Sequence, residues 1–155
     1  MQRLSTIVLQ AVIVLIGIAV FAGLVWEPQL EGVNAHATQL EIYFQDPFLA
    51  YVYLGSIPFF VALYWAFTVL RYVRHDKIFS QAAVKAVRTI RYCAFMTAGA
   101  IVGADALLIL FATGEDDAAG VMALSLVAIV TSIVIGTAAA VFEGILQSAI
   151  DRQRR

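Results

Sequence analysis

The sequence predicts an all-α fold, a four-helix transmembrane bundle whose N-terminus and C-terminus both lie in the cytoplasm. Two compositional observations predict the membrane class: 62% of the 155 residues are hydrophobic and only 14% are charged. Soluble domains average about 45–50% apolar and about 25% charged residues. A third observation, the placement of all ten Lys and Arg residues, predicts the orientation.

Four apolar stretches each reach the roughly 20 residues that a membrane-spanning helix needs. They cover about residues 7–26, 48–70, 92–112 and 121–142, and the helical pattern of the fourth continues to residue 150. A chain of this length is predicted to form one integral-membrane domain, residues 1–155. A cleaved signal peptide is the alternative for the first stretch, with "AHA" at residues 35–37 as its cleavage site. Signal peptides carry an apolar region of only about 7–15 residues, which favours a retained span.

Three positions predict how the helices begin and bend. Asp46 can cap a helix that starts at Pro47, where the missing N–H of proline costs no hydrogen bond. Pro58 lies inside the second stretch and removes a backbone donor, so the sequence predicts a kink there. Ser80 is the predicted N-cap of a helix that leads into the third stretch.

The cations are distributed so that one side of the membrane would hold all of them. One precedes the first stretch, six lie between the second and third, and three follow the fourth. The two other connections, residues 27–46 and 113–120, contain acidic residues and no Lys or Arg. The positive-inside rule therefore places both termini and residues 71–91 in the cytoplasm.

The basic segment, residues 71–91, predicts more than orientation. A helix from Ser80 places two sets of residues on separate stripes: the basic Lys85, Arg88 and Arg91, and the apolar Ala83, Val87, Ile90 and Ala94. The basic stripe is predicted to orient the chain and to contact anionic lipid. A docking surface for a cytosolic partner is the second interpretation. Nucleic-acid binding is not expected, because no recognised motif is present and no aromatic residues are interleaved for stacking.

Asp105 and Glu143 are acids within or beside apolar stretches. An ionised acid at the centre of a membrane helix costs about 2.5–3.5 kcal/mol, so such an acid is a functional candidate. Asp105 lies at the predicted depth of Ser56 and Thr131, and these three form a candidate intramembrane polar site whose hydroxyls could donate to the acid. Two interpretations stay open, an acid that holds the bundle together and a proton or cation pathway.

Glu143 lies near the predicted cytoplasmic interface, too far from Asp105 to be its partner. It is predicted to pair with cations such as Arg91 or Arg71. Gly99 and Gly103, in "GAIVG", form a small-xxx-small motif that lets helices approach closely. Packing within the chain is the favoured interpretation of that motif, and a homodimer face is the alternative.

No arrangement of residues predicts catalysis. Cys93 is the only cysteine, and His36 and His75 lie far apart, so neither a disulfide nor a metal cluster is expected. The sequence holds no HExxH motif, nucleotide loop or recognisable catalytic triad, which predicts a protein that is not an enzyme and has no cofactor. An external cation site at the acidic turn is conceivable, but its spacing matches no oxygen-ligand loop, and solvation better explains Glu115, Asp116 and Asp117.

Three stretches together resemble the bacterial membrane-protein family catalogued as domain of unknown function 2975. They are "DPFLAYVYLGSIPFFVALYWAFTVLRYV", "KIFSQAAVKAVRTIRYCAF" and "FEGILQSAID", within residues 45–151. The resemblance implies four helices and no assigned activity. Positions that fit the family pattern are Pro58, Phe79, Ser80, Lys85, Arg91, Tyr92 and Cys93.

The functional expectation is a non-enzymatic accessory, sensory or regulatory protein of the bacterial cytoplasmic membrane. It would present its basic cytoplasmic loop to membrane lipids or to a cytosolic or membrane protein partner, and a homo-oligomer is compatible with the glycine motif. No nucleic acid is expected as a partner. The alternative is a small transporter or ion-pathway subunit that uses Asp105.

Overall fold

The computed structural model describes residues 2–30, 47–111 and 118–155, which form four α-helices. These are α1 (Gln2–Leu30), α3 (Pro47–Arg74), α4 (Gln81–Phe111) and α5 (Ala118–Arg154). All four are long and apolar enough to cross a membrane. The all-helical, four-span prediction is therefore confirmed, and each predicted stretch falls within one helix except residue 112, which lies outside the described residues.

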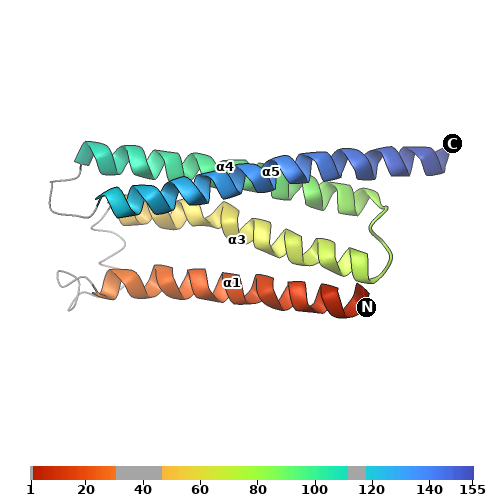
Figure 1. Cartoon of the computed structure of the whole chain (residues 1–155), viewed down its shortest axis with the longest axis horizontal. Coiled ribbons are helices and arrows are strands. Elements are labelled where there is room, and N and C mark those ends of the chain that lie inside the picture. Colours follow the sequence, from red (N-terminus) through yellow and green to blue (C-terminus); the bar gives the residue numbers. More distant parts are fainter. Residues whose placement is uncertain (1, 31–46, 112–117) are drawn as a thin grey trace.

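The four helices run side by side along the long axis of the molecule (Figure 1). The start of α1, the connection from α3 to α4 and the end of α5 all lie at one end (Figure 1). We call this the basic end, because it contains the segments that carry all the Lys and Arg residues. The opposite end, where α1 stops and α5 begins, is called the distal end.

Helix starts follow the predicted capping chemistry where they are described. The Ala83 N–H donates to Ser80 Oγ at 3.3 Å and α4 begins at Gln81, so Ser80 is the N-cap. Helix α3 begins at Pro47, as predicted, whereas the capping residue Asp46 lies outside the described residues. Helix α3 continues through Pro58, and Figure 1 shows this helix changing direction along its length.

The connection from α3 to α4 is a short, hydrogen-bonded turn. The Lys77 N–H donates to Tyr72 O at 2.8 Å and the Asp76 N–H donates to Val73 O at 3.3 Å, the two bonds of a Schellman motif. Asp76 occupies the left-handed position of this motif with φ 56°. The Ser80 hydroxyl donates to Lys77 O at 2.8 Å, so the motif that ends α3 is bonded directly to the cap that starts α4. The basic segment is thus a fixed corner between two helices.

Packing follows the order of the chain, because α1 packs mainly on α3, α3 on α4 and α4 on α5. Small residues set the closest approaches. Gly55 of α3 faces the Cβ of Ala100 on α4, and Gly136 of α5 lies under the Phe95 ring of α4. Most of the surface of α1 remains exposed, as expected for a helix that faces lipid on several sides.

The tightest apolar core lies at the basic end, between the start of α4 and the end of α5. Its residues are Ala83, Val84, Val87, Ala139, Leu146 and Ile150. At 1.5 Å per residue, the 37 residues of α5 span about 55 Å, whereas a bilayer core is about 30 Å thick. Helices α4 and α5 are therefore long enough to project beyond a membrane as a packed pair, where water supplies the hydrophobic driving force.

Candidate functional site

A cluster of charged residues joins α4 to α5 beside the apolar core. Arg88 Nε donates to Glu143 Oε1 at 2.7 Å, and Arg91 Nη1 lies 2.8 Å from Glu143 Oε2. Glu143 is buried, with 8% of its surface exposed. A carboxylate is retained at such a position because opposite charges compensate its lost hydration.

The two arginines are held to different degrees. The Arg88 side chain is 50% exposed and the Arg91 side chain is 26% exposed. The Arg91 contact is ionic, since no hydrogen bond reaches the buried Glu143 Oε2 atom. The Arg91 guanidinium also lies 4.8 Å from the centre of the Tyr92 ring, a cation–π distance. Arg91 is therefore fixed on both sides, whereas half of Arg88 stays available to solvent.

Lys85 completes the basic cluster, which we define as Lys85, Arg88, Arg91 and Glu143. Lys85 lies one helical turn before Arg88, is exposed, and forms no ion pair among the described residues. Three cations against one carboxylate leave this surface positive. The predicted division of α4 into two stripes is also observed: Ala83, Val87 and Ala94 are buried, Ile90 packs against the core, and the basic residues lie on the other stripe.

Glu143 pairs with cations, as the sequence predicts, and Arg91 is one of them. The suggested alternative partner Arg71 is wrong, because both ion pairs of Glu143 are to α4. Arg88, which the sequence assigned only to lipid or partner contact, is the partner that sequence reasoning missed. Its spacing from Arg91, on one face of the helix, was the available signal.

The structure does not join Asp105, Ser56 and Thr131 by hydrogen bonds. The Ser56 hydroxyl donates to Tyr53 O at 2.7 Å, and the Thr131 hydroxyl donates to Val127 O at 2.7 Å. Both hydroxyls are thus used within their own helices, which is common for Ser and Thr in membrane helices. Asp105 is partly buried on α4 and makes no ion pair within the described residues.

The two glycines of the "GAIVG" motif face different surroundings. A Cβ at Gly103 would overlap the hydroxyl of Tyr51, which donates to Ala100 O at 3.0 Å. Gly103 therefore packs within the chain, against α3. A Cβ at Gly99 would meet nothing within 4 Å, so this glycine does not contribute to packing among the described helices.

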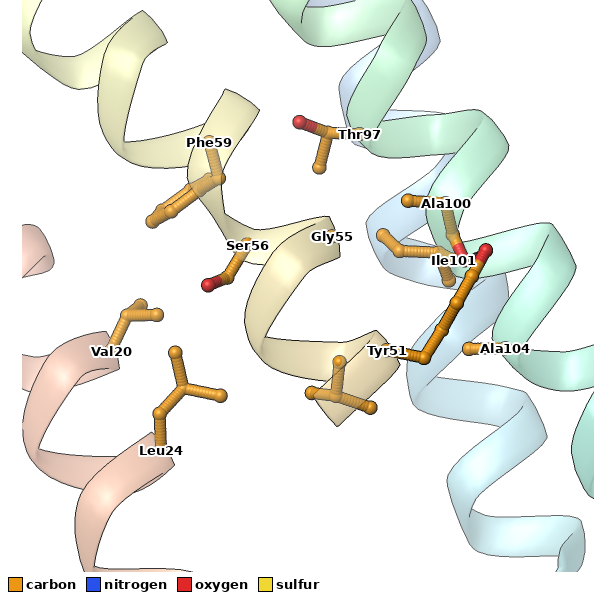
Figure 2. Close-up of a pocket in the computed structure, with 11 residues that line it drawn as sticks. Val20, Leu24, Tyr51, Gly55, Ser56, Phe59, Thr97, Ala100, Ile101 and Ala104 are labelled. Carbon is orange, nitrogen blue, oxygen red and sulfur yellow. Dashed lines mark hydrogen bonds between the residues drawn. The ribbon is translucent and has the colours of Figure 1, made fainter. Parts of the chain in front are cut away.

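An apolar cavity of about 320 Å³, the distal cavity, lies between α1, α3 and α4. In Figure 2, Val20 and Leu24 of α1 face Phe59 and the Ser56 hydroxyl across an open space, and Tyr51 reaches from α3 to α4. The Tyr53 hydroxyl closes α3 onto α1 by donating to Leu24 O. The lining offers no charged group, which suits an apolar occupant and not an ion.

The sequence also missed a polar contact between α1 and α3 at the basic end. Gln10, the one polar interruption of the first apolar stretch, is buried with 6% of its surface exposed. Its Nε2 donates to Phe67 O at 3.4 Å, and Arg74 Nη1 donates to its Oε1 at 3.5 Å. A lone Gln within an apolar run was the signal, because a buried amide needs partners.

The described residues contain no group of three or more His, Cys, Asp or Glu side chains placed to hold a metal ion. The acidic turn Glu115, Asp116 and Asp117 lies outside the described residues.

The fold and the basic cluster define an integral membrane protein with four candidate spans, of which α4 and α5 are joined by ion pairs at one end. The chain belongs to the family described as protein of unknown function (DUF2975), whose family model matches residues 21–154. It is similar to the "Uncharacterized membrane protein YoaS" of Bacillus subtilis (strain 168), with 37% identity over 153 residues that cover 97% of this chain and 94% of that protein. No solved structure matches the chain.

Proposed function

We propose that this protein is a non-enzymatic accessory, sensory or regulatory protein of the bacterial cytoplasmic membrane, with both termini in the cytoplasm. In this proposal its basic cluster binds an acidic surface of a cytosolic protein partner, and lipid contact at the same end is secondary. The single observation that carries the proposal is the rigid, positively charged α4–α5 pair at the basic end.

The length of the helices supports a cytosolic partner over the membrane surface alone. Residues 81–91 of α4 add about 16 Å beyond the predicted third span, and residues 143–154 of α5 add about 18 Å beyond the fourth. A segment that only oriented the chain would need cations near the interface, without a packed core behind them. The buried Val84 and Leu146 instead fix the two projecting helices against one another.

Lys85 offers the cleanest test of the partner site. Neutralising Arg88 or Arg91 would also remove one of the two ion pairs of the buried Glu143, so a lost partner could reflect local unfolding. Lys85 has no such structural ion pair among the described residues. The variant Lys85→Gln is therefore compared with Lys77→Gln, which removes another exposed cation at the same end.

The tagged proteins are cross-linked in native bacterial membranes and purified. We expect a cytosolic protein to co-purify with the wild type. Its recovery should fall by up to about fivefold with Lys85→Gln, since an exposed ion pair contributes up to about 1 kcal/mol, and should be unchanged with Lys77→Gln. Equal recovery with both variants, or a proportional loss with both, would contradict a specific site on the basic cluster.

A second candidate function, an ion pathway through Asp105, rests on one observation. Asp105 is a partly buried acid on a candidate span, with no ion pair among the described residues, and such acids often mark proton or cation routes. Proton or cation flux into liposomes that contain the purified protein tests it directly. Flux that Asp105→Asn abolishes without loss of folding supports the pathway, whereas unchanged flux excludes Asp105 from it.

A further inference from the structure

A second apolar cavity, the basic-end cavity, lies where all four helices meet. Its volume is about 400 Å³, and its lining is apolar throughout. Helix α1 contributes Leu9 and Ile13, α3 contributes three residues, α4 two and α5 three: Ala66, Val69, Leu70, Val87, Ile90, Ala138, Ala139 and Phe142. The loose packing of α1, which contacts mainly α3, leaves this space between α1 and the α4–α5 pair.

Arg74 lies close to the residues that line this cavity, on their basic-end side. Arg74 lies one helical turn beyond the lining residue Leu70, on the same face of α3. Long side chains on a helix point back towards its N-terminus, so Arg74 extends over the turn that contains Leu70. Its Nη1 reaches Gln10, which directly follows the lining residue Leu9. The polar contact and the apolar cavity are thus adjacent.

The charge of Arg74 is not compensated by a carboxylate among the described residues. The ion pairs found there both belong to Glu143, and the Arg74 guanidinium donates to a neutral amide oxygen, Gln10 Oε1, at 3.5 Å. Arg71 adds a second exposed cation one turn earlier on α3. A partly buried guanidinium beside an apolar space fits a ligand that is anionic at one end and apolar along the rest.

We propose that the basic-end cavity holds an acyl chain of an anionic phospholipid, with the lipid phosphate bound by Arg74. The lipid would fill the space between α1 and the other helices and would complete the packing that the chain alone leaves open. This site is separate from the basic cluster on α4 and α5, so it can fail or hold independently of the proposed partner. The charge of Arg74 argues for an anionic lipid over a neutral one, because an apolar cavity by itself selects no headgroup.

The distal cavity supplies the matched comparison. It is also apolar and also bounded by α1, α3 and α4, but no Lys or Arg lies within one helical turn of its lining residues along the sequence. We expect lipid chains there to show no headgroup preference. Substituting Ala66→Leu fills the basic-end cavity, and Ala104→Leu fills the distal cavity by the same added volume.

The test is native mass spectrometry of the purified protein in detergent with equal concentrations of phosphatidylglycerol and phosphatidylcholine. For the wild type we expect about fivefold more bound phosphatidylglycerol than phosphatidylcholine, because one cation near an anionic lipid contributes about 1 kcal/mol. Arg74→Gln and Ala66→Leu should each abolish the preference. Arg74→Lys, Ala104→Leu and the exposed Arg154→Gln should retain it. Glycerol 1-phosphate, the headgroup without chains, should not compete.

Several results would overturn the proposal. A wild type without preference, or a preference that survives Arg74→Gln, would remove the role of the cation. A preference that survives Ala66→Leu would remove the role of the cavity, and competition by glycerol 1-phosphate would show a free phosphate site in place of a lipid site. If Arg74→Gln does not fold, Arg74→Met, which keeps an apolar stem and removes the charge, tests the role of the cation, and Ala66→Leu tests the role of the cavity.

Discussion

Glu143 is the residue whose environment explains most about the basic end. Two guanidinium groups face it, and its surface is almost entirely removed from solvent. Its carboxylate links α4 to α5 between the core residues Ala139 and Leu146 of α5. The same pairing uses part of the positive charge of α4, which leaves Lys85 and half of Arg88 to face outward.

Removing the charge of Glu143 should destabilise the protein. In Glu143→Gln the neutral amide cannot balance the positive charges of the two guanidinium groups that face it. We expect this loss to lower the free energy of unfolding by about 1–3 kcal/mol. The measurement is the thermal unfolding midpoint Tm of the purified protein in detergent. Asp151→Asn is the control, because it removes the same charge from an exposed position on the same helix. Equal Tm values for the two variants would show that the Glu143 ion pairs contribute nothing to stability.

At the scale of the helices, Tyr51 and Gly103 set the contact between α3 and α4. The Tyr51 ring lies over Gly103 and its hydroxyl donates to Ala100 O, so a side chain at position 103 must displace it. Gly103→Ala should therefore lower Tm by the equivalent of about 1 kcal/mol, the value of a lost hydrogen bond. Gly99→Ala should leave Tm unchanged or raise it, because that position is open and alanine favours the helix.

A double substitution separates this contact from a general effect of alanine in α4. Tyr51→Phe removes the hydroxyl that a Cβ at position 103 would meet, so Gly103→Ala should cost less in that background. If the two substitutions were simply additive in Tm, the close approach of Tyr51 to Gly103 would not be the cause.

Much of the element-level structure could be predicted from the sequence, and the failures share a physical cause. The apolar stretches correctly predicted the four helices, and Ser80 correctly predicted the start of α4. Depth along a helix also follows from residue number, which is why Glu143 was correctly expected to meet Arg91. The acceptor that a hydroxyl chooses does not follow from depth, because the carbonyls of its own preceding helical turn compete for it. Ser56 and Thr131 were placed at the level of Asp105, yet their hydroxyls bond within their own helices.

At the scale of the whole molecule, the structure places both ends of the described chain together with the α3–α4 turn (Figure 1). The basic end then has every cation and the distal end has none, an asymmetry that only one orientation reconciles with the positive-inside rule. The orientation can be measured because Cys93 is the only cysteine and is buried. Cys93→Ala gives a cysteine-free background that alters only a small buried side chain.

In that background, single cysteines report which side each end faces. We expect a membrane-impermeant maleimide to label Asn34→Cys, between the first two spans, in bacterial cells whose cytoplasmic membrane is intact and whose outer layers let the reagent through. Gln153→Cys, an exposed position at the end of α5, should be labelled only after the cytoplasmic membrane is opened. The expected reason is the cost of moving cationic segments across the membrane, which would hold the basic end inside during insertion. Labelling of Gln153→Cys in intact cells, with Asn34→Cys protected, would show the opposite orientation. It would also contradict the proposal that the basic cluster binds a cytosolic partner.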